Sequence, residues 1–187
     1  MIHAREFETI LTSRKRKSKL WRHNLMKNKN VRFITTAAMI AALYVVLVLA
    51  FAPISFGAIQ ARIAEALTIL PYFTPAAIPG LTVGCLISNI LGGADMLDII
   101  FGTLATLIGA FGSYYIRKFK YLVWLPPFLA NTIIVPWVLR IAYFAEDSIP
   151  YMMFTVGVGE ILTCGILGTA LLLVLSRVDV VKRAFAQ

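Results

Sequence analysis

Charged side chains inside long apolar stretches are the residues of this chain best suited to chemistry. Glu65, Asp98 and Glu160 are the acidic members, and Arg62 is the basic one. A charge at the centre of a membrane helix costs ~2.5 to 3.5 kcal/mol, so such a residue needs a partner or a ligand. Carboxylates gathered in one pocket would bind a cation or a molecule rich in N–H donors.

Polar and aromatic side chains lie near these charges along the chain. Gln60, Asn89 and Asn131 fall at outer or middle depth of the expected helices, and Trp137 adds an aromatic ring. We predict that these four side chains join the four charged ones in a polar pocket open to the outside. Asparagines also link membrane helices by hydrogen bonds, and exposed rings also form interfacial belts, so both roles stay open.

The charged residues also have simpler explanations. Arg62 and Glu65 are three positions apart on one helix face and could neutralise each other. Asp98 could be an exposed cap where a loop meets a helix. Glu160 has no basic residue within ten positions in the sequence, which favours a ligand or proton role for it.

Continuous apolar runs position these residues. The chain has 187 residues, 59% of them hydrophobic, and a mean hydropathy of +0.81, values typical of membrane proteins. Backbone groups in lipid must bond internally, and the runs lack the alternation of barrel strands. We therefore predict an all-α integral membrane protein, a bundle of six transmembrane helices. The expected helices cover residues 33–52, 59–73, 75–91, 97–116, 121–143 and 150–176.

The positive charges predict how the helices are oriented. Ten of the eighteen Lys and Arg residues precede residue 33, and six others cluster within 117–120 and 177–183. The opposite loops carry Asp95, Glu146 and Asp147. Because cytoplasmic loops are enriched in Lys and Arg, we expect a multi-pass protein of the cell membrane with both termini in the cytoplasm.

The chain is expected to have three parts. Residues 1–32 form a basic N-terminal extension that we expect to be flexible, 33–176 the six-helix transmembrane domain, and 177–187 a short cytoplasmic tail. The run RKRKSK would suit nucleic acid in a soluble protein, but beside a membrane span we expect contact with anionic lipid instead. A second methionine, Met26, leads to the hypothesis that residues 1–25 are dispensable.

Motifs for several other chemistries are absent from the sequence. It has no GxxxxGK[ST] phosphate loop and no HExxH zinc motif. Cys85 and Cys164 lie in apolar segments, where we expect buried thiols without a disulfide. We expect no cofactor and no metal. A small intramembrane enzyme using Glu160 and Asp98 as acid and base is a less favoured alternative, because no nucleophile–base pair is visible.

Small residues in the first expected helix form a second pattern. Ala37, Ala38, Ala41 and Ala42 form two pairs at four-residue spacing. We call these four residues the alanine stripe. Such stripes let another helix approach closely, whether it belongs to a partner protein or to the same chain.

The stretch ARIAEALTILPYFTPAAIPG, within residues 56–110, resembles the QueT family, the substrate-binding S components of energy-coupling factor (ECF) transporters. The resemblance extends from about Met26 to the C-terminus. It implies an S-component fold of six helices and no catalysis by this chain. It also implies a transmembrane T subunit and two cytoplasmic ATPases as partners, with the alanine stripe as the surface that docks the T subunit.

The resemblance further implies uptake of a queuosine precursor, 7-aminomethyl-7-deazaguanine. This molecule has a protonated primary amine and a guanine edge with adjacent N–H donors, so one carboxylate can bind the ammonium and another the edge. Arg62, Gln60 or an asparagine could donate to the carbonyl of the base. Which carboxylate contacts which group stays open, and another vitamin-like solute stays an alternative.

Overall fold

The structure is a computed structural model that describes residues 29–55 and 62–178. The chain divides into two compact units, residues 1–35 and 36–187, and the contacts that build the site lie within the second. Every regular element of the described residues is helical, and none is a strand.

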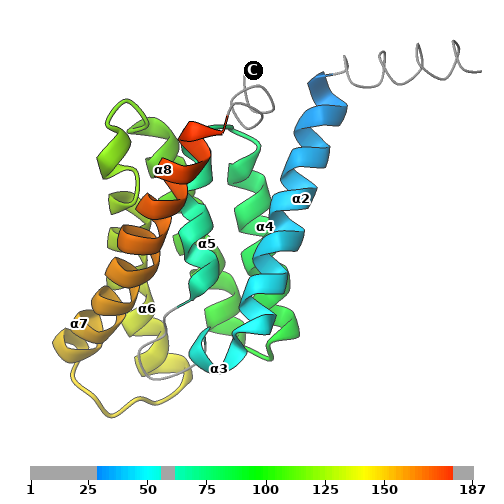
Figure 1. Ribbon diagram of the computed structural model, residues 1–187. Helices are drawn as coiled ribbons and strands as arrows, with labels where there is room; N and C mark the ends of the chain where they lie inside the picture. Colours follow the sequence, from blue (N-terminus) through cyan, green and yellow to red (C-terminus); the bar gives the residue numbers. More distant parts are fainter. Residues whose placement is uncertain (1–28, 56–61, 179–187) are drawn as a thin grey trace, which may run out of the picture. The chain divides into compact units, whose positions relative to one another are not determined.

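The helices follow one another with short connections. In chain order they are α2 (Lys29–Ala50), α3 (Ala52–Ser55), η1 (Ile63–Tyr72), α4 (Ala77–Leu91), α5 (Met96–Tyr115), η2 (Lys120–Leu122), α6 (Leu125–Ala142), α7 (Ile149–Glu160), η3 (Ile161–Gly168) and α8 (Thr169–Arg177). The stretch from α7 to α8 is one continuous helical column (Figure 1).

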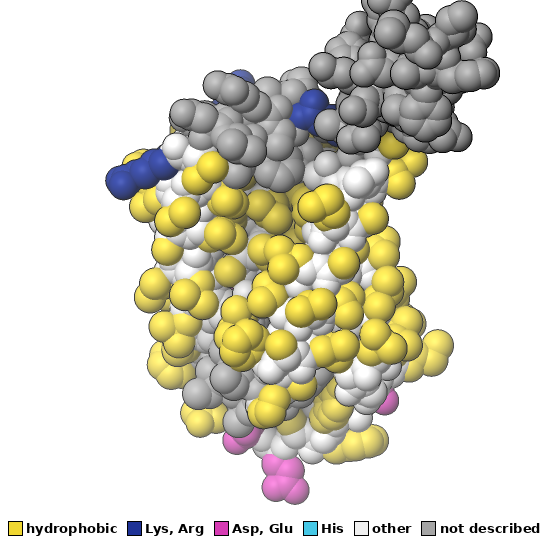
Figure 2. Space-filling view, turned by 45° about the vertical axis from the view of Figure 1, so that its right-hand side comes forward, with side chains coloured by type: hydrophobic (Ala, Val, Ile, Leu, Met, Phe, Trp, Pro, Cys, Tyr) yellow, Lys and Arg dark blue, Asp and Glu magenta, His cyan; other side chains and the backbone are white. Residues whose placement is uncertain are grey.

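In the part of the chain that the structure describes, four helical stretches are long and apolar enough to cross a membrane: Lys29–Ala50, Met96–Tyr115, Lys120–Ala142 and Ile149–Arg177. The apolar helices η1 and α4 are shorter. Hydrophobic side chains cover most of the face shown in Figure 2, with Lys and Arg at one end and Asp and Glu at the other. These features confirm the prediction of an all-helical membrane protein, whereas the number of six spans and their orientation stay predictions.

Contacts between distant residues connect the helices at both ends. Lys120 Nζ donates to Ser176 Oγ at 3.0 Å, which brings the segment before α6 to the end of α8. At the other end the backbone N–H of Asp95 donates to Tyr143 Oη at 3.0 Å, which brings the start of α5 to the end of α6. The basic residues near 117–120 therefore lie at the end opposite to Asp95.

Glycines at two helix contacts let the backbones approach closely. A Cβ placed on Gly84 of α4 would lie 2.8 Å from Tyr44 Cβ and 3.0 Å from the carbonyl oxygen of Ala41, both on α2. A Cβ placed on Gly109 of α5 would lie 2.7 Å from Pro127 Cα on α6. A larger side chain at either glycine would push the two helices apart.

Two elements depart from the α-helices predicted for them. Where an α-helix is expected over 59–73, the structure has the 3₁₀-helix η1, which is 10 residues long. A 3₁₀-helix of that length reaches roughly 20 Å, against roughly 15 Å for an α-helix. Within the last expected helix, η3 is a π-helix. Rare helix types often occur at functional sites, and both of these carry residues of the polar clusters described below.

The three prolines of α6 occupy different positions. Because α6 begins at Leu125, Pro126 and Pro127 lie in its first turn, where the backbone N–H that proline lacks would have no partner within the helix. Pro136 lies inside the helix. The first two prolines therefore start α6.

The hydrogen bonds of η1 should be the weakest of the buried helices. It packs against α4, α5, η3 and α8, and its residues from Ala64 to Pro71 are buried. We expect its backbone amides to exchange with deuterium faster than those in the middle of α5, because 3₁₀ hydrogen bonds have poorer geometry. Hydrogen-exchange mass spectrometry on detergent-purified protein would compare the two helices, and equal protection would contradict the expectation.

Candidate functional site

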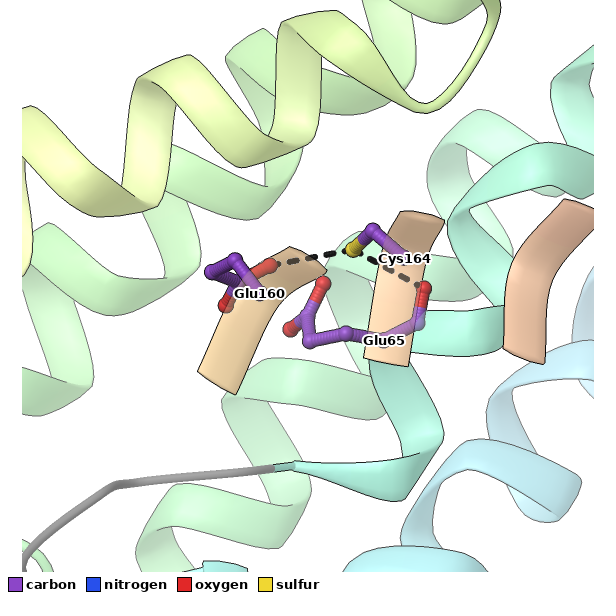
Figure 3. Close-up of side chains that lie close together, drawn as sticks. All are labelled: Glu65, Glu160 and Cys164. Atoms are coloured by element: carbon purple, nitrogen blue, oxygen red, sulfur yellow. Dashed lines mark hydrogen bonds between the residues drawn. The ribbon is translucent and has the colours of Figure 1, made fainter. Parts of the chain in front are cut away.

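Two buried glutamates from different helices lie beside a thiol (Figure 3). Glu65 belongs to η1, Glu160 ends α7 and Cys164 belongs to η3. One carboxylate oxygen of each glutamate and the sulfur of Cys164 all lie within 4.8 Å of one another. Tyr44 Oη donates to Glu65 Oε1 at 2.5 Å. Asn131 Nδ2 donates to Glu160 Oε1 at 2.9 Å, and Cys164 Sγ donates to Glu160 Oε2 at 3.0 Å. We call these five residues the carboxylate cluster.

Side chains also fix the backbone of η1 against η3. Cys164 Sγ lies 3.4 Å from the carbonyl oxygen of Glu65, and Thr68 Oγ1 donates to the same oxygen at 2.6 Å. The thiol has one hydrogen, so Cys164 donates either to this carbonyl oxygen or to Glu160 Oε2, whereas the Thr68 bond is independent of that choice. The position of Glu65 therefore depends on the π-helix that carries Cys164.

A second polar cluster surrounds Gly102 of α5. Arg62 forms a salt bridge with Asp98, with an N–O distance of 3.4 Å and both side chains buried. Asn89 Nδ2 lies 3.5 Å from the carbonyl oxygen of Asp98. A Cβ placed on Gly102 would lie 3.0 Å from Asp98 Oδ1 and 3.3 Å from Asn89 Nδ2, so glycine lets these side chains lie close to the backbone of α5. We call these four residues the Gly102 cradle.

Tyr143, the residue after α6, contacts the Gly102 cradle. Its hydroxyl donates to Asp98 Oδ2 at 3.3 Å, and partial desolvation raises its pKa. The alternative that Asp98 is an exposed cap is wrong, because Asp98 is buried. Asp95 caps α5 instead, accepting from the backbone N–H of Leu97 at 2.8 Å.

Three buried oxygen atoms of the two clusters have no hydrogen-bond partner among the described residues. They are Glu65 Oε2, Asn89 Oδ1 and Asp98 Oδ1, on residues that are 1%, 0% and 2% exposed. An unpaired buried acceptor costs about 1–3 kcal/mol. Such atoms are suited to accept hydrogen bonds from the N–H groups of a ligand.

Six of the eight side chains predicted for the pocket belong to the carboxylate cluster or the Gly102 cradle. Trp137 does not: it is 54% exposed and lines an apolar groove of about 360 Å³ between α5 and α6. Gln60 lies outside the described residues. The ligand-binding role of all eight stays a prediction.

Three residues of the clusters were not predicted from the sequence. Cys164 follows Glu160 by four positions, a spacing that places two side chains on one helix face and could have identified it. Tyr44 is a tyrosine within an apolar run, and a buried tyrosine hydroxyl usually needs a partner. Gly102 gave no signal, because its role depends on side chains from other helices.

The alanine stripe divides between two faces of α2. The carbonyl oxygens of Ala37 and Ala41 lie 2.7 and 3.0 Å from the Cβ positions of two glycines on α4, so this pair packs inside the chain. Ala38 and Ala42 are exposed. Only the exposed pair offers a surface to another protein.

An all-helical bundle with several long apolar helices and two buried polar clusters defines a multi-span membrane protein. The model of the family described as QueT transporter matches residues 34–177. The chain therefore belongs to the QueT transporter family, as the sequence predicts.

A curated relative from Lactococcus lactis subsp. cremoris (strain MG1363), named queuosine precursor transporter QueT, is similar to part of the chain. The two are 40% identical over 85 residues, which cover 44% of this chain and 50% of the relative. The match thus spans about half of that relative's length. No solved structure matches the chain.

Proposed function

We propose that this protein is the substrate-binding subunit of an ECF-type ABC uptake transporter that captures 7-aminomethyl-7-deazaguanine from outside the cell. Family membership and the name of the relative support transport of a queuosine precursor. The three unpartnered buried acceptors are the observation that carries the ligand class. They need N–H donors, and this precursor offers them at its amine and along its guanine edge.

The proposal includes six membrane crossings, made by the four long stretches together with η1 and α4. The 15 residues of α4 reach roughly 22 Å, less than the ~30 Å apolar core, so the two short crossings would end below the bilayer surface. The basic end then faces the cytoplasm. Asp98, Tyr143 and Asp95 lie at the opposite end, so the Gly102 cradle is nearer the outside.

Entry of the ligand requires movement, because the side chains of both clusters are buried. η1 carries Glu65 and begins directly after Arg62, so it contributes to both clusters. A displacement of this 3₁₀-helix would expose the two clusters together. Its weaker hydrogen bonds make it the element most easily moved.

Delivery inside the cell requires energy that this chain has no motif to supply. The sequence contains no phosphate loop, so ATP would be hydrolysed by two partner ATPases and coupled through a T subunit. The exposed residues Ala38 and Ala42 are the proposed contact with that subunit.

Isothermal titration of detergent-purified full-length protein would test the ligand assignment. We expect 7-aminomethyl-7-deazaguanine to bind at least about 10-fold more tightly than guanine, which lacks the cationic amine, and riboflavin not to bind. Tighter binding of riboflavin would show that the solute is a different one. EDTA should leave the affinity unchanged; loss of binding with EDTA would show that a metal held by Glu65, Glu160 and Cys164 takes part.

Substitution of the exposed stripe should separate binding from transport. We expect Ala38→Trp to abolish uptake while the ligand affinity stays within about 2-fold, because its side chain points away from α4 and can only obstruct a docking partner. Uptake of labelled ligand by cells, together with titration of purified protein, would measure both. Leu104→Trp on the exposed face of α5 is the matched control. Normal uptake by Ala38→Trp would contradict the docking role, and equal loss of binding would mean internal packing.

A further inference from the structure

The two polar clusters differ in their charge. In the carboxylate cluster, the side chains that donate to Glu65 and Glu160 are neutral: Tyr44, Asn131 and Cys164. In the Gly102 cradle, the guanidinium of Arg62 balances the carboxylate of Asp98. Buried carboxylates whose hydrogen-bond donors, among the described residues, are neutral favour a positively charged ligand group, whereas an ion pair favours a neutral polar one.

The two clusters are neighbours along η1. Arg62 directly precedes η1 and Glu65 lies in its first turn, where the backbone N–H of Glu65 donates to the carbonyl oxygen of Arg62 at 2.8 Å. Glu65 contributes one unpartnered oxygen. The other two unpartnered oxygens belong to Asn89 and Asp98, beside Arg62. A small ligand is therefore long enough to contact both clusters at once.

The structure of the Gly102 cradle suits a flat edge with donors and an acceptor. The free oxygens of Asp98 and Asn89 can accept from adjacent N–H groups. The guanidinium of Arg62 has five N–H donors and can donate to a ring carbonyl while it stays paired with Asp98. Because Gly102 has no side chain, Asp98, Asn89 and Arg62 can gather beside it, which places their polar groups close together for one ligand edge.

From these contacts we infer that the two clusters are two subsites for one ligand. The carboxylate cluster binds the primary ammonium group, and the Gly102 cradle binds the N–H edge and carbonyl of the neutral heterocycle. This inference rests on the proposed function. It assigns Glu65 and Glu160 to the amine and Asp98, with Asn89 and Arg62, to the base.

Crossing site variants with ligand analogues tests the assignment. Full-length wild type, Glu160→Gln and Gly102→Ala would each be titrated with 7-aminomethyl-7-deazaguanine and with 7-methyl-7-deazaguanine, which lacks the amine. Glu160→Gln should weaken the amine ligand by about 10- to 100-fold but the methyl analogue by less than about 3-fold. Gly102→Ala, whose new Cβ meets Asp98 Oδ1, should weaken both ligands by a similar factor. Thermal unfolding of each variant verifies its fold.

A third ligand tests the base subsite by removing a group of the ligand instead of a group of the protein. 7-Aminomethyl-7-deazahypoxanthine lacks the exocyclic amino group, so it should bind wild type about 10-fold or more weakly than the parent ligand does. Asn89→Leu should reduce the affinity for this analogue by a smaller factor than the affinity for the parent ligand. Equal weakening of the amine and methyl ligands by Glu160→Gln, or weakening of the amine ligand alone by Gly102→Ala, would overturn the subsite assignment and leave the proposed function intact. Failure of wild type to bind the parent ligand would overturn the proposed function itself.

Discussion

Glu65→Gln combined with Glu160→Gln is expected to weaken binding of 7-aminomethyl-7-deazaguanine by at least about 100-fold while the protein stays folded. Hydrogen bonds to a charged group contribute about 1.5–3 kcal/mol each, and two of them act on the ligand ammonium. Glutamine keeps the shape of each side chain. Tyr44 can still donate to an oxygen at position 65, and at position 160 the single amide oxygen can accept from Asn131 or from Cys164. Titration measures the affinity, and thermal unfolding measures the stability.

The matched control removes the same charge elsewhere. Glu146→Gln combined with Asp147→Asn neutralises two exposed acidic residues of the loop between α6 and α7. Its effect on affinity should be below about 3-fold, because exposed charges are screened by salt. If the glutamate double variant binds as tightly as wild type, or if both double variants lose affinity equally, the carboxylate cluster is not the site of the amine.

The general positions of the acidic residues could be predicted because lipid limits where a charge can be. Glu65 and Glu160 lie in apolar runs far apart in the sequence, and the cost of burying each predicted that polar groups would gather around them. The structure brings them together with Asn131, an amide also identified from its place in an apolar run. The same reasoning placed Asp98 in the pocket, and its salt bridge with Arg62 is buried.

The geometry of the two unusual helices could not be predicted. An apolar run of ten residues fits an α-helix and a 3₁₀-helix equally well by composition, because the choice depends on contacts with other helices. η1 packs against four neighbours, and two side chains of the bundle bind the carbonyl oxygen of Glu65. Those contacts involve Thr68 of η1 and Cys164 of the π-helix η3.

The same limit explains how the polar residues are distributed. Their types predicted one pocket, but the structure separates them into a pair of glutamates with neutral donors and an arginine–aspartate pair beside Gly102. This division depends on which helix faces which, and periodicity within one helix carries no such information. Trp137 was predicted to join the pocket for the same reason, but its ring lies on an exposed face beside an apolar groove.

Arg62→Met is expected to destabilise the ligand-free protein by about 3–5 kcal/mol, the cost of leaving a buried charge without its partner. Asp98 of α5 would keep a buried carboxylate, to which Tyr143 alone among the described side chains would still donate. Methionine retains much of the apolar stem of arginine, so the loss of stability comes more from the missing charge than from changed packing. Thermal unfolding of detergent-purified protein would measure the change.

A second substitution should restore most of this loss. Asp98→Asn in the Arg62→Met background removes the unpaired charge while an amide still accepts from Tyr143, so the double variant should be more stable than Arg62→Met alone. Arg140→Met, which removes an exposed arginine that donates to Ala145 and Asp147 carbonyls, should cost less than about 1 kcal/mol. An equal effect of Arg62→Met and Arg140→Met, or a double variant less stable than both of its single variants, would show that the buried ion pair does not hold α5 to η1.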